Sequence, residues 1–82
     1  MREKELLEQI IDGCDDALCD AFLRRMDAAL RIAGQKMDAG LPVWSPEDEQ
    51  RMLNRVTHGL SPELSRKAYV LWKSLTRMSR GR

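Results

Sequence analysis

Apolar residues in the first half of the chain follow the three-and-four spacing of one face of an amphipathic helix. This apolar stripe comprises Leu7, Ile11, Cys14, Leu18, Phe22, Ala29 and Ile32. The helical pattern runs from Glu3 to about Met37, and the first strong stop signal is the segment Ala39-Gly40-Leu41-Pro42. The spacing predicts one helix of about 35 residues, roughly 50 Å long at 1.5 Å per residue.

Two serine-proline pairs predict where two shorter helices begin. Serine favours the N-cap and proline the first helical position, and acids follow both Ser45-Pro46 and Ser61-Pro62. The second helix should end near His58-Gly59, and the third should run close to the end of the chain. No segment alternates as a strand does. We therefore expect an all-α fold of one long, one short and one medium helix.

The long helix does not fit inside a compact monomer of 82 residues. A chain of this length forms one domain, which we expect to span residues 1–82, and a globule of that size is only about 25–30 Å across. Two short helices cannot cover the whole apolar stripe of a rod of roughly 50 Å. A second copy is the simplest cover, and we predict an intertwined homodimer of three-helix protomers.

Composition narrows the function classes. Hydrophobic residues make up 43% and charged residues 33%, a balance that argues against disorder. No apolar run approaches the roughly 20 residues of a membrane span, and the N-terminus lacks the apolar stretch of a signal peptide, so we expect a cytoplasmic protein without a membrane partner. Because there is one histidine, His58, and no CxxC motif, the chain has no ligand set for a zinc site, and we expect no metal.

The net charge of +1 conceals an uneven distribution of charge. Residues 1–60 carry 8 Lys/Arg against 12 Asp/Glu, whereas residues 61–82 carry 6 against 1. The basic segment could bind nucleic acid, or it could pack beside the acidic one. We favour packing, and expect no nucleic acid partner, because no aromatic residues alternate with the basic ones. The tail 77–82 is expected to be a solvated helix end.

Four polar residues occupy positions where the helical patterns require apolar ones. Arg25 and Lys36 lie on the core-facing side of the first helix, 11 residues apart and nearly in rotational register. Glu49 and Ser79 lie on the apolar faces of the second and third helices. The four could satisfy one another, or they could line a pocket for an anionic small molecule. We favour the pocket because arginine and lysine both suit carboxylates, and small cores rarely hold four polar groups.

With these residues in place, the chain resembles the all-helical (type II) chorismate mutases. The matching pieces cover nearly the whole chain in the family's order: residues 14–18, 22–26, 34–36, 41–43, Glu49, 71–72 and 79–80. The spacing from Arg25 to Lys36 to Glu49 is the most specific part of the match.

The resemblance implies an intertwined dimer that rearranges chorismate to prephenate in the shikimate pathway, for phenylalanine and tyrosine biosynthesis, without a cofactor. By similarity, Arg25 would bind a substrate carboxylate, and Lys36 would donate to the ether oxygen and a carboxylate. Glu49 would bind the ring hydroxyl, and Ser79 would help hold a carboxylate. Arg25, Lys36 and Glu49 are thus the catalytic candidates, and all four residues are substrate-binding candidates.

At two positions the chain has an acidic residue where the family has an arginine. The arginine that the family has 17 residues before Arg25, and that crosses into the partner's site, is Glu8 here. The arginine immediately before the family's glutamate is Asp48. Each lost charge-assisted contact should weaken the binding of a dianion by about 1–3 kcal/mol.

Two further differences accompany them. Ser45 stands at the family's aspartate, and the family's glutamine would be residue 83, beyond Arg82. The departures leave two alternatives to an active mutase: an impaired chorismate-mutase-like domain for dimerisation or ligand sensing, or a related isochorismate pyruvate lyase. Glu49 favours the mutase over the lyase.

Overall fold

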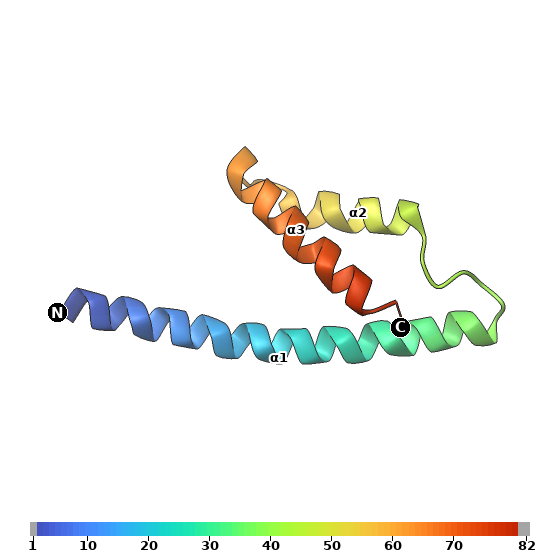
Figure 1. The fold of residues 1–82 in the computed structure, drawn as a ribbon, viewed down its shortest axis with the longest axis horizontal. Coiled ribbons are helices and arrows are strands. Elements are labelled where there is room, and N and C mark those ends of the chain that lie inside the picture. The colour runs from blue at the N-terminus through green and yellow to red at the C-terminus, as the bar shows by residue number, and fades with distance from the viewer. Residues whose placement is uncertain (1, 81–82) are drawn as a thin grey trace.

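The computed structural model describes residues 2–80, and within that range the chain forms three helices and no strand. They are α1 (Arg2–Asp38), α2 (Pro46–Thr57) and α3 (Pro62–Met78). The order of long, short and medium helices is the predicted one, so the all-α prediction is confirmed (Figure 1).

Local hydrogen bonds explain where the helices begin and end. The Ser45 hydroxyl accepts from the backbone N–H of Asp48 at 3.3 Å, and Ser61 caps α3 in the same way. After α1, Gly40 has a φ of +71°, which allows the N–H of Leu41 to donate to the carbonyl of Lys36 at 2.8 Å. These signals lie within a few residues of each helix end, which is why the sequence pattern located them.

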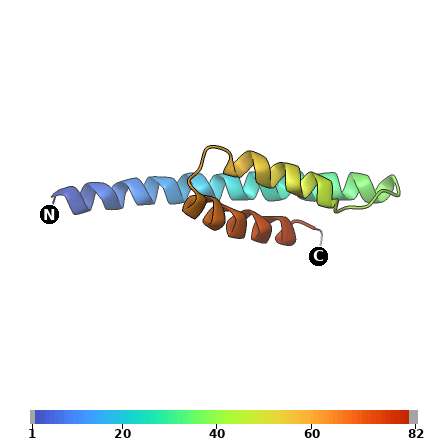
Figure 2. The same ribbon diagram turned by 90° about the horizontal axis from the view of Figure 1, so that it is seen from above.

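The three helices make an elongated molecule. Its principal extents are 57 × 26 × 17 Å, and the long axis is the 37-residue rod of α1. The radius of gyration is 16.1 Å, against about 12 Å for a compact domain of this length. Figures 1 and 2 show α2 and α3 beside the C-terminal half of α1, while its N-terminal part projects alone.

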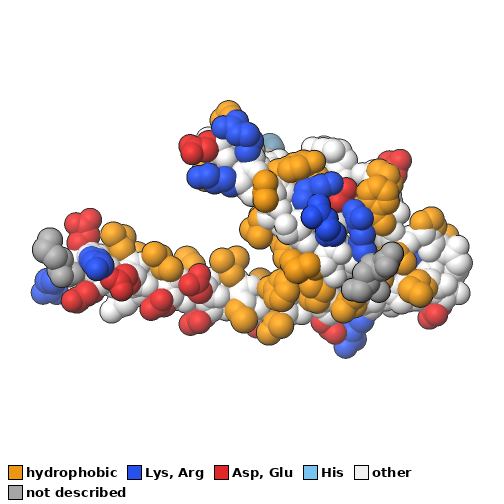
Figure 3. Space-filling view, viewed as in Figure 1, with side chains coloured by type: hydrophobic (Ala, Val, Ile, Leu, Met, Phe, Trp, Pro, Cys, Tyr) orange, Lys and Arg blue, Asp and Glu red, His pale blue; other side chains and the backbone are white. Residues whose placement is uncertain are grey.

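The described residues contain almost no core. Only Ala33 in α1, 5% exposed, and Leu53 in α2, 4% exposed, are buried hydrophobic residues. The accessible surface is 6891 Å², against about 5,000 Å² for a folded monomer of this mass. Figure 3 shows hydrophobic side chains along the projecting part of α1 and where α3 approaches α1. A single copy thus leaves most of its apolar surface in water.

The charged side chains pair mainly within their own helices. In α1, Glu8 pairs with Lys4 and Asp20 with Arg24. In the described residues, the ion pairs between the basic C-terminal segment and the acidic first 60 residues join Lys73 of α3 and Arg80 to Glu49 of α2. None of the helices in residues 2–80 has the length and apolarity to span a bilayer.

Candidate functional site

A cavity of about 190 Å³ lies where the C-terminal half of α1, the start of α2 and the end of α3 meet. It brings together all four polar residues singled out in the sequence. Its lining consists of Arg25, Ala29, Ile32, Ala33, Lys36, Val43, Trp44, Ser45, Asp48, Glu49, Met52, Thr76, Ser79 and Arg80. Three cations and two carboxylates therefore face a small, partly apolar space.

A larger hollow, of about 510 Å³, lies between α2 and α3. Only Arg66 among its lining residues is charged, and the rest are apolar or neutral polar side chains such as Leu53 and Tyr69. Recognition of a small anionic ligand requires convergent cationic donors, of which the smaller cavity has three and this hollow has one. The smaller cavity is therefore the candidate site.

Glu49 is the most buried charged group of the cavity. Its side chain is 9% exposed, and its Oε2 accepts a hydrogen bond from Lys73 Nζ at 3.4 Å. Its Oε1 lies 3.7 Å from Arg80 Nη2, beyond hydrogen-bond reach, and has no hydrogen-bond partner. Two cations thus compensate the buried carboxylate, while one of its oxygens stays open as an acceptor in the cavity wall.

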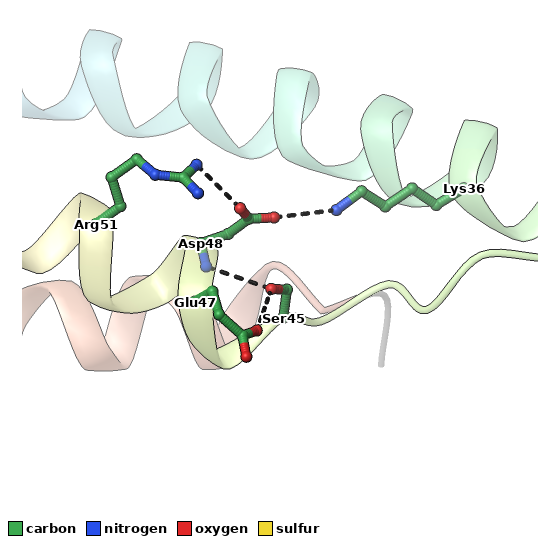
Figure 4. A network of polar contacts seen from close by, with 5 residues as sticks. All are labelled: Lys36, Ser45, Glu47, Asp48 and Arg51. Carbon is green, nitrogen blue, oxygen red and sulfur yellow. Dashed lines mark hydrogen bonds and ion pairs between the residues drawn. The ribbon is translucent and has the colours of Figure 1, made fainter.

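Lys36 comes from the last turn of α1 and meets an acid across the cavity mouth. Its Nζ lies 3.9 Å from Oδ2 of Asp48, and Oδ1 of Asp48 accepts from Arg51 Nη1 at 3.0 Å (Figure 4). The same figure shows the cap that holds Asp48, with the Ser45 hydroxyl also donating to Glu47. An anionic ligand must therefore compete with Asp48 for Lys36.

Arg25 and Ser79 differ in what they offer a ligand. Within residues 2–80, no ion pair involves Arg25, so its guanidinium donors remain for a ligand. The Ser79 hydroxyl instead donates to the carbonyl of Leu75 at 2.8 Å, in the turn that ends α3. In this arrangement Ser79 can accept a hydrogen bond from a ligand, and it must rotate to donate one to a carboxylate.

The expectation of a solvated tail is wrong at Arg80. Its side chain is 35% exposed, and its guanidinium carbon lies 4.7 Å from the centre of the Trp44 ring. The sequence did carry a signal for this missed residue and for Lys73, because Tyr69, Lys73, Thr76 and Arg80 follow a four-three-four spacing. That spacing places a polar stripe on α3 beside its apolar one.

Of the remaining departures from the family pattern, Glu8 lies outside the cavity and Ser45 lines it. Glu8 is exposed on the projecting part of α1, about 25 Å along the helix from Arg25, and does not reach the cavity of its own chain. Ser45 lines the cavity and caps α2. Arg82 lies outside the described residues.

Comparison with known proteins identifies one family. The family model described as chorismate mutase type II matches residues 2–82. No curated protein and no solved structure matches the chain. The family match takes in all three helices and every residue that lines the cavity.

Proposed function

We propose that this chain, which belongs to the chorismate mutase type II family, rearranges chorismate to prephenate. The observation that carries the proposal is the cavity, where Arg25, Lys36 and Arg80 stand around the buried carboxylate of Glu49. A ligand with two carboxylates and a hydroxyl complements that set of charges. We place the reaction in cytoplasmic phenylalanine and tyrosine biosynthesis.

The proposed reaction depends mainly on the shape and the charge of the site. The rearrangement is unimolecular, with no covalent intermediate and no cofactor, so the site must hold the compact reactive conformer and stabilise charge on the breaking ether oxygen. Arg25 has free donors for a carboxylate, and Lys36 is a compact donor for the ether oxygen. The open Oε1 of Glu49 is an acceptor for the ring hydroxyl. Ser79 caps the end of α3, and its hydroxyl is a donor for a carboxylate once it rotates away from the carbonyl of Leu75.

We also propose that the active form is a homodimer. The apolar stripe continues along the projecting part of α1, where Leu7 and Ile11 are both exposed. The exposed surface of one chain exceeds that of a typical folded monomer by about 1,900 Å², or about 3,800 Å² for two chains, which is within the total area that obligate homodimers bury. A second copy of the chain carries the same exposed apolar stripe, so the two stripes can pack against each other across a two-fold axis.

A second candidate function rests on the pair between Lys36 and Asp48. If the aspartate holds the lysine too firmly, the cavity binds its ligand without turning it over and the domain serves ligand sensing. The third candidate, an isochorismate pyruvate lyase, is disfavoured by Glu49, which the mutase uses for the ring hydroxyl.

Product analysis separates these functions. The chain is incubated with chorismate and, separately, with isochorismate, and proton NMR follows the products. We expect prephenate from chorismate and no pyruvate from isochorismate. Pyruvate release would assign the lyase, and binding without conversion would assign the sensing domain. If the chain neither binds nor converts chorismate, the proposal is contradicted.

A further inference from the structure

Three buried side-chain atoms in residues 2–80 lack a hydrogen-bond partner: Glu49 Oε1, Thr76 Oγ1 and Arg80 Nε. All three residues line the same cavity. Buried polar groups in proteins are nearly always paired, so unpaired ones are expected where a ligand supplies the partner. Their concentration in one place marks the ligand-facing wall of the cavity.

The three atoms define what that ligand offers. The carboxylate oxygen of Glu49 can only accept, the N–H of Arg80 Nε can only donate, and the Thr76 hydroxyl can do either. A ligand therefore needs a donor near Glu49 and an acceptor, preferably anionic, near Arg80. A hydroxyl and a carboxylate on one small molecule meet both needs.

Arg80 is held in place while its Nε stays unused. The Trp44 ring lies 4.7 Å from its guanidinium carbon, and stacking of this kind fixes the plane of the group. The nearest carboxylate oxygen, Glu49 Oε1, is 3.7 Å from Nη2, too far for a hydrogen bond. Trp44 and Glu49 thus orient the guanidinium, and neither of them accepts a hydrogen bond from the Nε–H.

The position of the Arg80 guanidinium matters because residue 48 is an acid. Asp48 lines the cavity with a negative charge at a position where the resemblance implies a cation. We propose that Arg80 binds a carboxylate of the substrate through its Nε–H and supplies, from the end of α3, the positive charge that position 48 lacks. This inference rests on the proposed function and adds a substrate-binding residue to it.

Binding of prephenate, measured by titration calorimetry, tests the inference without requiring turnover. We expect Arg80→Ala to weaken binding by roughly tenfold to a hundredfold, because a charge-assisted hydrogen bond is lost. Arg80→Lys, which keeps the charge but loses the planar donor, should recover part of the affinity. Arg77→Ala is the matched control, since Arg77 is exposed in the last turn of α3 and does not line the cavity.

A double-mutant cycle separates binding from support of Glu49. If Arg80 only balanced the charge of Glu49, Arg80→Ala would have no further effect in a Glu49→Gln background. We expect the loss of prephenate affinity to persist in that background. Helicity by circular dichroism confirms that each variant is folded.

The outcomes distinguish this inference from the proposed function. Normal prephenate binding by Arg80→Ala, with loss of binding in Lys36→Ala, overturns the role of Arg80 and leaves the mutase proposal standing. A loss that disappears in the Glu49→Gln background also overturns it. A wild-type chain that binds neither chorismate nor prephenate overturns both.

Discussion

Asp48 and Lys36 form an ion pair across the mouth of the cavity, 3.9 Å apart. The aspartate is exposed and also pairs with Arg51, so Lys36, Asp48 and Arg51 form a solvent-accessible network of ion pairs. Such pairs contribute about 0.2–1 kcal/mol each, which is small enough for a dianionic ligand to displace. We therefore expect the pair to lower the affinity of the cavity for an anion without abolishing it.

Removing the charge of Asp48 should improve the site. We predict that Asp48→Asn raises kcat/KM for chorismate about two- to fivefold, because Lys36 no longer pairs with a carboxylate and a negative charge leaves the cavity wall. Steady-state kinetics at low ionic strength measures this, since salt screens the effect.

Asp38→Asn is the matched control for that variant. It removes the same charge two residues after Lys36, and Asp38 does not line the cavity, so kcat/KM should stay unchanged. A decrease in kcat/KM for Asp48→Asn would show that the aspartate has a positive role in binding.

At the scale of single helices, the sequence located most of what the structure shows. The caps at Ser45 and Ser61 and the turn at Gly40 depend on neighbours within a few residues, so their patterns were sufficient. The stripes also placed Arg25 and Lys36 on one side of α1, because helical geometry alone fixes that relation. Those two side chains now line one cavity.

The partners of those side chains could not be predicted in the same way. Whether Lys36 meets Asp48 or Glu49 depends on how the loop 39–45 returns the chain toward α1. The contacts of Arg80 with Trp44 and Glu49 join positions more than 30 residues apart. Such distant pairings follow from packing in three dimensions, which helical periodicity does not encode.

The apolar stripe of α1 yields a prediction about assembly. We expect sedimentation equilibrium to give twice the 9.4 kDa of one chain, and Ile11→Glu to weaken the dimer by about a hundredfold or more. Ile11 is 58% exposed in a single copy, so its replacement removes no contact within the chain, while a two-fold interface would bury two copies of the new charge.

Gln9→Glu is the control for that substitution, since residue 9 lies on another face of the same helix and should leave the dimer intact. A wild-type chain that sediments as a stable 9.4 kDa monomer would contradict the account of α1.

The whole molecule combines a nearly coreless chain with one charged cavity. Because only Ala33 and Leu53 are buried among the described residues, we expect the fold to gain stability when a second copy covers its exposed apolar surfaces. The cavity, in contrast, is lined within one chain by residues of all three helices. Each chain thus lines its own cavity, and we propose that the dimer holds those helices together.

The most direct test of this account is the rate at which chorismate absorbance decays with the wild-type chain and with Lys36→Ala. We predict catalysed decay by the wild type, lowered at least about a hundredfold in the variant, because Lys36 stabilises charge that develops in the transition state. Lys67→Ala is the control, since Lys67 pairs only with Glu63 of its own helix in the described residues. Normal turnover by a folded Lys36→Ala variant, or none by the wild type, would contradict the claim that this cavity is a chorismate mutase site.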